Sequence, residues 1–159
     1  MTTAPAPVGD PPGERDGSVG PGVAAEENRA AAAAIARSPR AALRRYALAY
    51  TNWRAGDLAA HERELIALAI GAARLAAQQT AASRSATVSL ATNRVENKGV
   101  ILAIAPGEGP AGGQWVIVTQ EQTTGTGAYA GLPPAPHVTL ARVARVGQGW
   151  AVSQWRPKS

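Results

Sequence analysis

The sequence from Gly99 to Thr119, GVILAIAPGEGPAGGQWVIVT, contains two apolar runs separated by a cluster of Gly and Pro. The first run, Val100–Ile104, and the second, Trp115–Thr119, are rich in β-branched residues, which favour strands. A Gly/Pro-rich break between two such runs predicts two antiparallel strands joined by a loop. Because both runs are apolar at consecutive positions, we expect each strand to be covered on most of both faces, or to lie at the centre of a curled sheet.

Alternating polar and apolar residues predict three more strands around this pair. The alternation covers Thr87–Thr92 before the pair, and Val138–Val146 and Trp150–Trp155 after it. The last two strands are joined by residues 147–149, Gly-Gln-Gly, which are typical of a tight turn. Gln122–Pro136 contains three Gly and three Pro. We therefore expect a long loop there, and loops of this length without structure of their own are often functional.

Two helices are predicted ahead of the strands. Ser38 and Pro39 form a start signal, with Ser as the N-cap and Pro at the first helical position. Gly56 ends this helix, and we expect the second helix from Asp57 to about Ala82, so that the two form a helical hairpin. Residues at spacings of three and four mark the buried face of the first helix: Leu43, Tyr46, Ala47, Tyr50 and Trp53.

The sequence divides into three parts. Residues 1–22 contain five Pro, five Gly and, after Met1, only two large apolar residues, which predicts a disordered acidic tail. Residues 23–37 are rich in Ala, the residue with the highest helix propensity, and predict a loosely attached helix. Residues 38–157 hold the two helices followed by the strands. We therefore expect a single α+β domain there, with the helices packed in a curved antiparallel sheet of about five strands.

The charge of the 159-residue chain is unevenly distributed. Residues 1–27 carry a net charge of −4 and the remainder carries +9. Such a basic body can bind a polyanion, with the acidic segment competing for the same face. Arg40, Arg44 and Arg45 on the first predicted helix are the candidates for phosphate contact. No helix-turn-helix or aromatic–basic strand pattern accompanies them, so a general bias toward Arg in the composition is the alternative explanation.

Several classes of site are missing from the sequence. The chain contains no Cys, which excludes disulfides, thiolate catalysis and zinc fingers. Asp57 and His61 are one helical turn apart, but no second His follows at metal-ligand spacing, so we expect a solvated polar face and no metal. The Gly-rich segments do not open a helix after a strand, and no phosphate-binding loop is predicted. We therefore expect no cofactor, and we assign no catalytic residue.

Two groups of residues are candidates for lining a pocket. Glu121 and His137 lie at the two ends of the predicted loop and can meet across a hairpin, but no spacing selects a nucleophile to accompany them. Aromatic residues at helix and strand spacing either line a pocket or form plain core. These residues are Tyr46, Tyr50, Trp53, Trp115, Trp150 and Trp155.

Three short motifs resemble actinobacterial conjugation-associated proteins. They are Pro39–Ala42 (PRAA), Tyr46–Trp53 (YALAYTNW) and the closing Trp150–Pro157 (WAVSQWRP). Over residues 38–157 the order of elements is similar to the cone-shaped α+β fold of nuclear transport factor two, ketosteroid isomerase and the TcpC-like and type IV secretion domains. The closing motif is the most specific of the three, and it is a packing motif.

The resemblance implies a strongly bent sheet that wraps the helices and leaves a pocket at its wide end. Enzymatic members of the fold place an Asp, Glu or His in that pocket, whereas here only Glu121 lies near a strand and residues 122–159 contain no acid. The resemblance therefore implies a non-catalytic interaction module of a conjugative transfer or integrative-element system. Its partners would be other transfer proteins or a second copy. A small-molecule or isomerase-like pocket protein and an accessory DNA-contacting protein are the alternatives.

The sequence gives one expectation about location. It contains no run of about 18 uncharged apolar residues of the kind that crosses a bilayer, and its start lacks the features of a secretory signal. The transfer-channel relatives implied by the resemblance carry a membrane anchor ahead of this domain, and that anchor is missing. We therefore expect a cytoplasmic protein that reaches a membrane only through a partner.

Overall fold

The computed structural model describes residues 35–85, 88–108 and 113–159. The predicted tail at residues 1–22 and most of the predicted helix at 23–37 lie outside them. The helices are α2 (Pro39–Thr51), α3 (Leu58–Ala67), α4 (Gly71–Ser85) and α5 (Val88–Thr92), with the 3-10 turns η1 (Ala55–Asp57) and η2 (Gly127–Tyr129). The strands are β1 (Trp53–Arg54), β2 (Glu96–Pro106), β3 (Gln114–Thr124), β4 (Ala135–Val146) and β5 (Gly149–Pro157).

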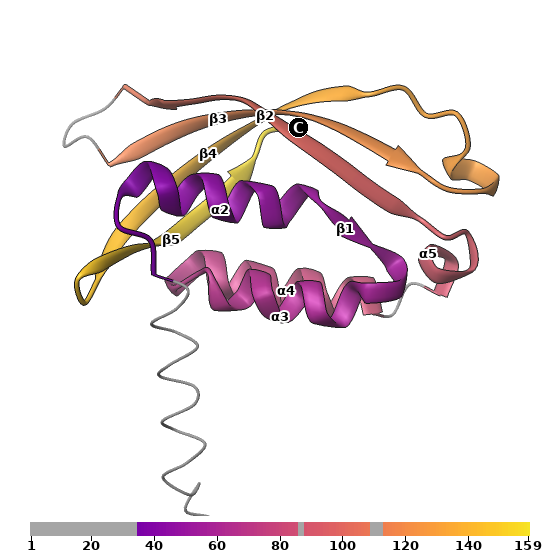
Figure 1. Cartoon of the computed structure of the whole chain (residues 1–159), viewed down its shortest axis with the longest axis horizontal. Helices are drawn as coiled ribbons and strands as arrows, with labels where there is room; N and C mark the ends of the chain where they lie inside the picture. The colour runs from indigo at the N-terminus through magenta and orange to yellow at the C-terminus, as the bar shows by residue number, and fades with distance from the viewer. Residues whose placement is uncertain (1–34, 86–87, 109–112) are drawn as a thin grey trace, which may run out of the picture.

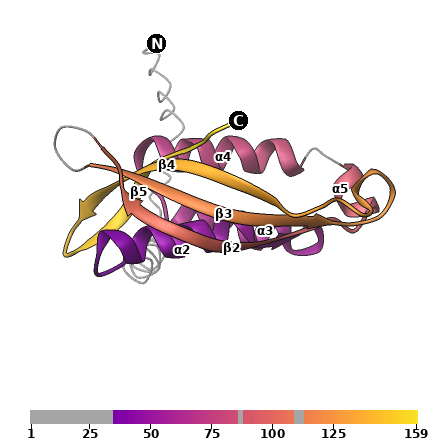
Figure 2. The same cartoon turned by 90° about the horizontal axis from the view of Figure 1, so that it is seen from above.

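The five strands form one antiparallel sheet in the order β1-β2-β3-β4-β5. The sheet is curved, and α2, α3 and α4 all lie on its concave side (Figure 1). Viewed from above, the strands pass over the helices, with α2 and α4 toward opposite edges (Figure 2). The predicted α+β class with a strongly curved sheet of five strands is confirmed.

Helix α2 begins as the sequence predicts and ends earlier than expected. The Ser38 hydroxyl oxygen accepts a hydrogen bond from the Ala41 N–H at 3.2 Å, and Pro39 occupies the first turn. The helix ends at Thr51, because Asn52 takes an extended conformation. Trp53 was expected on this helix, but it lies in β1, where it pairs with Asn97 of β2.

The predicted single helix from Asp57 to about Ala82 is wrong, because the chain breaks between α3 and α4. The Ile70 N–H donates to the Val152 carbonyl of β5 at 2.9 Å, and Ala69 forms a bridge with the same residue. Ala69 and Ile70 therefore leave the helix, whose C-cap is Leu68, and bind the edge of the sheet. Gly71 follows with a φ of +53°, a left-handed conformation that glycine adopts at little cost.

The predicted strand over Thr87–Thr92 is also wrong, since residues 88–92 form the short helix α5. No residue of α5 is buried, and the Val88 side chain is 78% exposed. The Thr92 hydroxyl and the Asn93 amide donate back to the Val88 and Ser89 carbonyls at 3.2 and 2.8 Å. Alternation of polar and apolar residues indicates a strand only where one face is buried, and here neither is.

The predicted loop over Gln122–Pro136 is shorter in the structure. Strand β3 continues to Thr124 and β4 begins at Ala135, so the connection covers residues 125–134 and includes η2. Glu121 pairs with Ala135, which extends the hairpin into the expected loop. The Thr126 N–H then donates to the Asn93 carbonyl at 2.9 Å and holds the connection against the start of β2.

The hydrophobic core lies between the concave face of the sheet and the helices. Its aromatic centre joins α2 to β5, because the Trp155 ring lies 4.9 Å from Tyr46 and 5.3 Å from Tyr50, measured between ring centroids. The chain has no Phe, so these three rings supply most of the large apolar volume. Aliphatic side chains from every layer complete this core: Leu43, Leu65, Leu68, Ile104, Ile117 and Val152.

Candidate functional site

A hydrogen-bonded polar cluster lies where the C-terminal end of α2 meets β2 and β3. The Asn97 side-chain amide donates to the Thr51 carbonyl at 2.7 Å and to a carboxylate oxygen of Glu121 at 2.9 Å. The other carboxylate oxygen of Glu121 accepts from the Thr119 hydroxyl at 2.9 Å. The Asn97 amide oxygen accepts from the Thr123 hydroxyl, also at 2.9 Å. Asn97 is buried, so this cluster fixes α2 to both strands.

The cluster holds Glu121 as a hydrogen-bond acceptor. Each of its carboxylate oxygens already has a donor, and Asn97 uses both of its amide hydrogens. A general base needs a free lone pair directed at a substrate proton. The arrangement therefore suits structural attachment of α2, and it leaves about two of the four lone-pair sites of the carboxylate without a donor among the described residues.

Glu121 and His137 do come together, because His137 pairs with Thr119, two residues from Glu121 on β3. Both line a small cavity of about 210 Å³ at this end of the sheet. The His137 side chain is exposed, and no hydrogen bond joins it to Glu121 among the described residues. The other lining residues are Asn97, Thr123, Leu132, Pro133 and Ala135.

None of the six aromatic candidates lines this cavity. Tyr46 is 1% exposed and belongs to the core, and Trp115 packs against the same core from β3. Burial raises the pKa of Tyr50, with the Arg84 guanidinium opposing the shift and Glu121 adding to it. Burial also raises the pKa of Tyr46, and Tyr50 adds to that shift. Tyr46 and Trp155 thus belong to the core, and Tyr50 and Trp115 pack against it.

Trp53 lies on the other side of the cluster and lines a larger open cavity of about 440 Å³ between β1, α3 and β2. The Arg84 guanidinium lies over its ring, 4.7 Å from the centroid. Asp57, His61, Glu64 and Glu96 line the same cavity. Within the described residues, no three His, Cys, Asp or Glu side chains gather closely enough to hold a metal ion.

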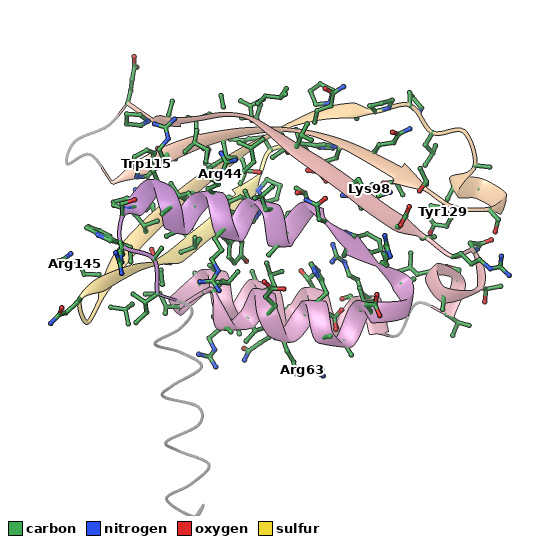
Figure 3. The ribbon with its side chains drawn as sticks, viewed as in Figure 1. Arg44, Arg63, Lys98, Trp115, Tyr129 and Arg145 are labelled. Atoms are coloured by element: carbon green, nitrogen blue, oxygen red, sulfur yellow. The ribbon has the colours of Figure 1, made fainter. Side chains whose placement is uncertain are left out.

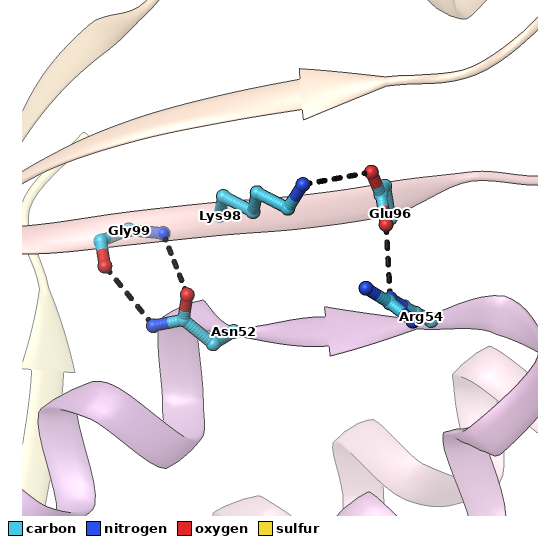
Figure 4. Close-up of polar contacts among 5 residues, drawn as sticks. All are labelled: Asn52, Arg54, Glu96, Lys98 and Gly99. Carbon is cyan, nitrogen blue, oxygen red and sulfur yellow. Dashed lines mark hydrogen bonds and ion pairs between the residues drawn. The ribbon is translucent and has the colours of Figure 1, made fainter.

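Beyond its pairing with β1, the edge of β2 is contacted by side chains. The Asn52 amide donates to the Gly99 carbonyl at 3.0 Å, and its oxygen accepts from the Gly99 N–H at 3.2 Å, as a neighbouring strand would (Figure 4). Next to it, Glu96 pairs with Arg54 at 3.0 Å and with Lys98 at 3.2 Å. The hydrogen bond from Lys98 lowers the pKa of the Glu96 carboxyl. These contacts discourage further strand pairing at this edge.

The convex side of the sheet is the feature that sequence analysis misjudged, because no described residue covers it. The helices all lie on the opposite side (Figure 1). Alternation with the buried Ile104, Ile117 and Thr139 places the intervening side chains outward. The register aligns Ala103 with Val118 and Val138, so apolar groups form rows across three strands. We call these residues the outer face: Val100, Ala103, Ala105, Val116, Val118, Val138 and Leu140.

The outer face is exposed to solvent, unlike a sheet face that packs on a second layer. Val100 is 59% exposed and Val138 is 39% exposed. A β-bulge between Ile101 and Ala103 also turns Leu102 out of the sheet, where it is 56% exposed. Contiguous apolar surface of this kind marks interaction sites.

Two of the three arginines predicted to contact a polyanion lie together. Arg40 and Arg44 line an open groove of about 400 Å³ between α2 and β2. The Arg40 guanidinium also donates to the Ile104 carbonyl at 2.8 Å. Figure 3 shows Arg44 on the side of α2 that faces the strands. Arg45 follows Arg44 on the helix and does not line this groove.

His61 was expected on a solvated face, but its side chain is only 9% exposed. Its Nε2 atom is buried and makes no hydrogen bond within the described residues. Burial lowers the pKa of His61, and the Arg84 guanidinium lowers it further, whereas Glu64 acts in the opposite direction. The imidazole is therefore neutral in the folded protein near pH 7.

The buried His61 predicts that the protein loses stability as the pH falls from about 7 to about 5. Below the unfolded pKa of about 6.5, the unfolded state binds a proton more readily than the folded state does, so protonation favours unfolding. The limiting slope is about 1.4 kcal/mol of unfolding free energy per pH unit. Urea unfolding of the wild type and of His61→Asn across this range measures it. The loss should disappear in His61→Asn and persist in His137→Asn, whose side chain is exposed.

Comparison with known proteins identifies a solved structure with a similar fold. No protein-family model matches the sequence, and no curated protein matches it. Among solved structures, the VirB8 protein of Agrobacterium tumefaciens is similar, with a TM-score of 0.56 and 13% sequence identity. The superposition covers 84% of this chain and 92% of that one. The chain therefore has the cone-like α+β fold of nuclear transport factor two, as VirB8 does. None of its described helices is long and apolar enough to cross a membrane.

Proposed function

We propose that this protein is a non-catalytic interaction module of a type IV secretion-like system, of the kind that serves conjugative transfer or an integrative element. The observation that carries the proposal is the outer face, an apolar surface across β2, β3 and β4 that no described residue covers. The motifs at 39–53 and 150–157 and the fold shared with VirB8 support the secretion context. The partner is another protein of the transfer system.

Both edges of the sheet carry bound groups, which favours binding of a partner through the convex face. Asn52 occupies the backbone groups of Gly99 at the β2 edge. At the β5 edge, Ala36 and Trp150 exchange two backbone hydrogen bonds of 3.2 and 2.8 Å, and Ile70 binds Val152. A partner strand would have to displace these groups. A partner that packs across the convex side displaces only water from apolar side chains, which is favourable.

We expect a charged substitution on the outer face to weaken partner binding with little effect on the stability of the fold. Val138→Asp places a charge on the β4 side of the face, next to Val118 of β3, and we expect it to weaken partner binding at least tenfold, which is about 1.4 kcal/mol. Because Val138 is already 39% exposed, we expect the unfolding free energy to change by no more than ~1 kcal/mol. Binding is measured by calorimetry against the purified products of the genes that flank this one, and stability by urea unfolding.

Leu75→Asp is the matched control. Leu75 is 57% exposed on α4, on the helical side of the molecule, so the same charge there should leave binding unchanged. Equal weakening by both substitutions, or tight binding that survives Val138→Asp, would contradict docking through the outer face.

The cavity that brings Glu121 and His137 together supports a second candidate, a small-molecule or isomerase-like pocket protein. Its volume of about 210 Å³ is below the ~300 Å³ of the smaller ligand pockets. A thermal-shift screen with apolar ligands tests it. A ligand that stabilises the wild type but not the Glu121→Gln/His137→Gln variant would favour this function over the interaction module.

A further inference from the structure

The groove between α2 and the edge of β2 has a composition that suits an anionic chain segment. Its walls are the first two turns of α2 and the bulged part of β2, and its volume is about 400 Å³. No Asp or Glu from the described part of the chain lines it. Its lining residues are Ser38, Arg40, Ala41, Arg44, Ile101, Leu102, Ala103 and Ile104. We call it the α2–β2 groove.

The strand side of the α2–β2 groove presents backbone groups that have no partner within the described ranges. Asn52 binds both backbone groups of Gly99, which shows that Gly99 directs them toward the edge. In an antiparallel pair this direction repeats every second residue, so Ile101 directs its N–H and carbonyl into the groove. Among the described residues, the next contact along this edge is from Arg40 to the Ile104 carbonyl. The backbone of Ile101 therefore lies open between two occupied positions.

The helix side supplies unpaired positive charge. Neither Arg40 nor Arg44 forms an ion pair with another described residue. Arg40 uses one nitrogen for the Ile104 carbonyl, which leaves its remaining N–H groups for a ligand. Arg44 is exposed on the same wall. A guanidinium binds a carboxylate through two parallel hydrogen bonds, so the groove favours carboxylate side chains.

The chain itself contains an acidic segment close enough to reach the groove. Residues 1–27 carry a net charge of −4 against the basic remainder. The chain from residue 27 to Ile35 spans at most about 28 Å when extended, and the 13 residues of α2 span about 20 Å. Ser38, three residues after Ile35, already lines the groove. The acidic residues of this segment are Asp10, Glu14, Asp16, Glu26 and Glu27.

We propose that the acidic segment, residues 10–27, binds in the α2–β2 groove of its own chain, with its carboxylates paired to Arg40 and Arg44. Covalent connection raises the effective concentration of the segment at the groove to the millimolar range, so weak ion pairs are sufficient. The segment then acts as an internal competitor, and an anionic partner reaches the groove only by displacing it. This role differs from docking through the outer face, although the two surfaces share Ala103.

The test compares the full-length wild type with a full-length variant in which the five acids are neutralised by D10N, E14Q, D16N, E26Q and E27Q. Backbone NMR spectra and amide hydrogen exchange are measured for both. In the wild type we expect the Ile101 amide to exchange about tenfold more slowly than in the variant. The amide resonances of Arg40, Arg44 and Leu102 should differ between the two proteins. Raising NaCl from about 0.05 to about 0.5 M should move the wild-type resonances toward those of the variant.

Two further variants make the result decisive. Asp57→Asn/Glu64→Gln removes two acids next to a different cavity and should leave the groove resonances unchanged. Arg44→Gln keeps the contact between Arg40 and Ile104, and in that background neutralising the five acids should have a much smaller effect. Identical groove resonances and Ile101 exchange in the wild type and the neutralised variant would overturn the proposal. So would resonance changes that depend on protein concentration, because they would indicate a second copy in the groove.

Discussion

Replacing Gly99 with alanine is expected to lower the unfolding free energy by about 3 kcal/mol, although the change adds a single methyl group. A Cβ at this position would overlap both the Cβ and the Oγ1 of Thr51, and neither can move without shifting the end of α2. Thr51 is 1% exposed and its hydroxyl donates to the Ala47 carbonyl at 2.8 Å, so its side chain is fixed. The strand and the helix must separate, which also breaks the contact between Asn52 and Gly99.

Urea unfolding measures the effect of Gly99→Ala. Gly56→Ala is the matched control, because no atom lies within 4 Å of a Cβ added there, and it should change the unfolding free energy by less than about 0.5 kcal/mol. Thr51→Gly in the Gly99→Ala background removes the overlap and should recover part of the loss. A stability of Gly99→Ala within error of the wild type would show that β2 and α2 are not packed this closely.

Truncating Trp155 to alanine is expected to cost about 3–5 kcal/mol of unfolding free energy. The Trp155 side chain is 7% exposed and contacts the rings of Tyr46 and Tyr50, so it is the main connection between α2 and β5. No Phe elsewhere in the chain can fill the space. The helix would lose most of its large apolar contacts with the last strand, and we expect a large drop in the melting temperature, measured by circular dichroism.

Two variants separate ring packing from other effects. The indole Nε1 of Trp155 is buried and makes no hydrogen bond within the described residues. Trp155→Phe therefore loses volume but no polar contact, and should cost clearly less than Trp155→Ala. Trp150 is partly exposed and lies under the Arg145 guanidinium at 5.2 Å. Its replacement by alanine should cost less than that of Trp155, and the reverse order would contradict a core centred on Trp155.

The elements that local chemistry determines were predictable. Ser38 and Pro39 predict the start of α2 correctly, because an N-cap hydroxyl and a proline act within the first turn. The two apolar runs predict β2 and β3, and their register follows the predicted hairpin. The α+β class follows from the order of helices and strands.

The errors share a cause, which is contact between residues far apart in the chain. Nothing near Ala69 and Ile70 shows that they bind Val152 of β5, yet that contact divides the second helix. The two-residue strand β1 is too short to show a pattern, and it exists because Trp53 pairs with Asn97. Residues 88–92 alternate like a strand, but no layer buries one of their faces, and they form a helix.

The candidate site was predictable in part. Glu121 and His137 were expected to meet across a hairpin, and the register of β3 and β4 brings them to one cavity. Asn97 was missed because it lies in a polar stretch that predicts a turn. The alternation of side chains along the strand could have identified it. Asn97 is two residues before Gly99 and four before Ile101, so it lies on the inward side of β2. A polar residue at an inward position requires a partner, and Glu121 supplies it.

The close approach of Tyr46 and Tyr50 to Trp155 also provides an intrinsic optical signal. The ring centroids of Tyr46 and Tyr50 on α2 lie 4.9 and 5.3 Å from that of Trp155 on β5. Excitation energy absorbed by these tyrosines is therefore transferred to the indole, which emits it as tryptophan fluorescence. Separation of α2 from β5 would lengthen these two distances and lower the efficiency of the transfer to Trp155. Fluorescence excited at the tyrosine band can therefore follow opening of the cone in solution, without an added label.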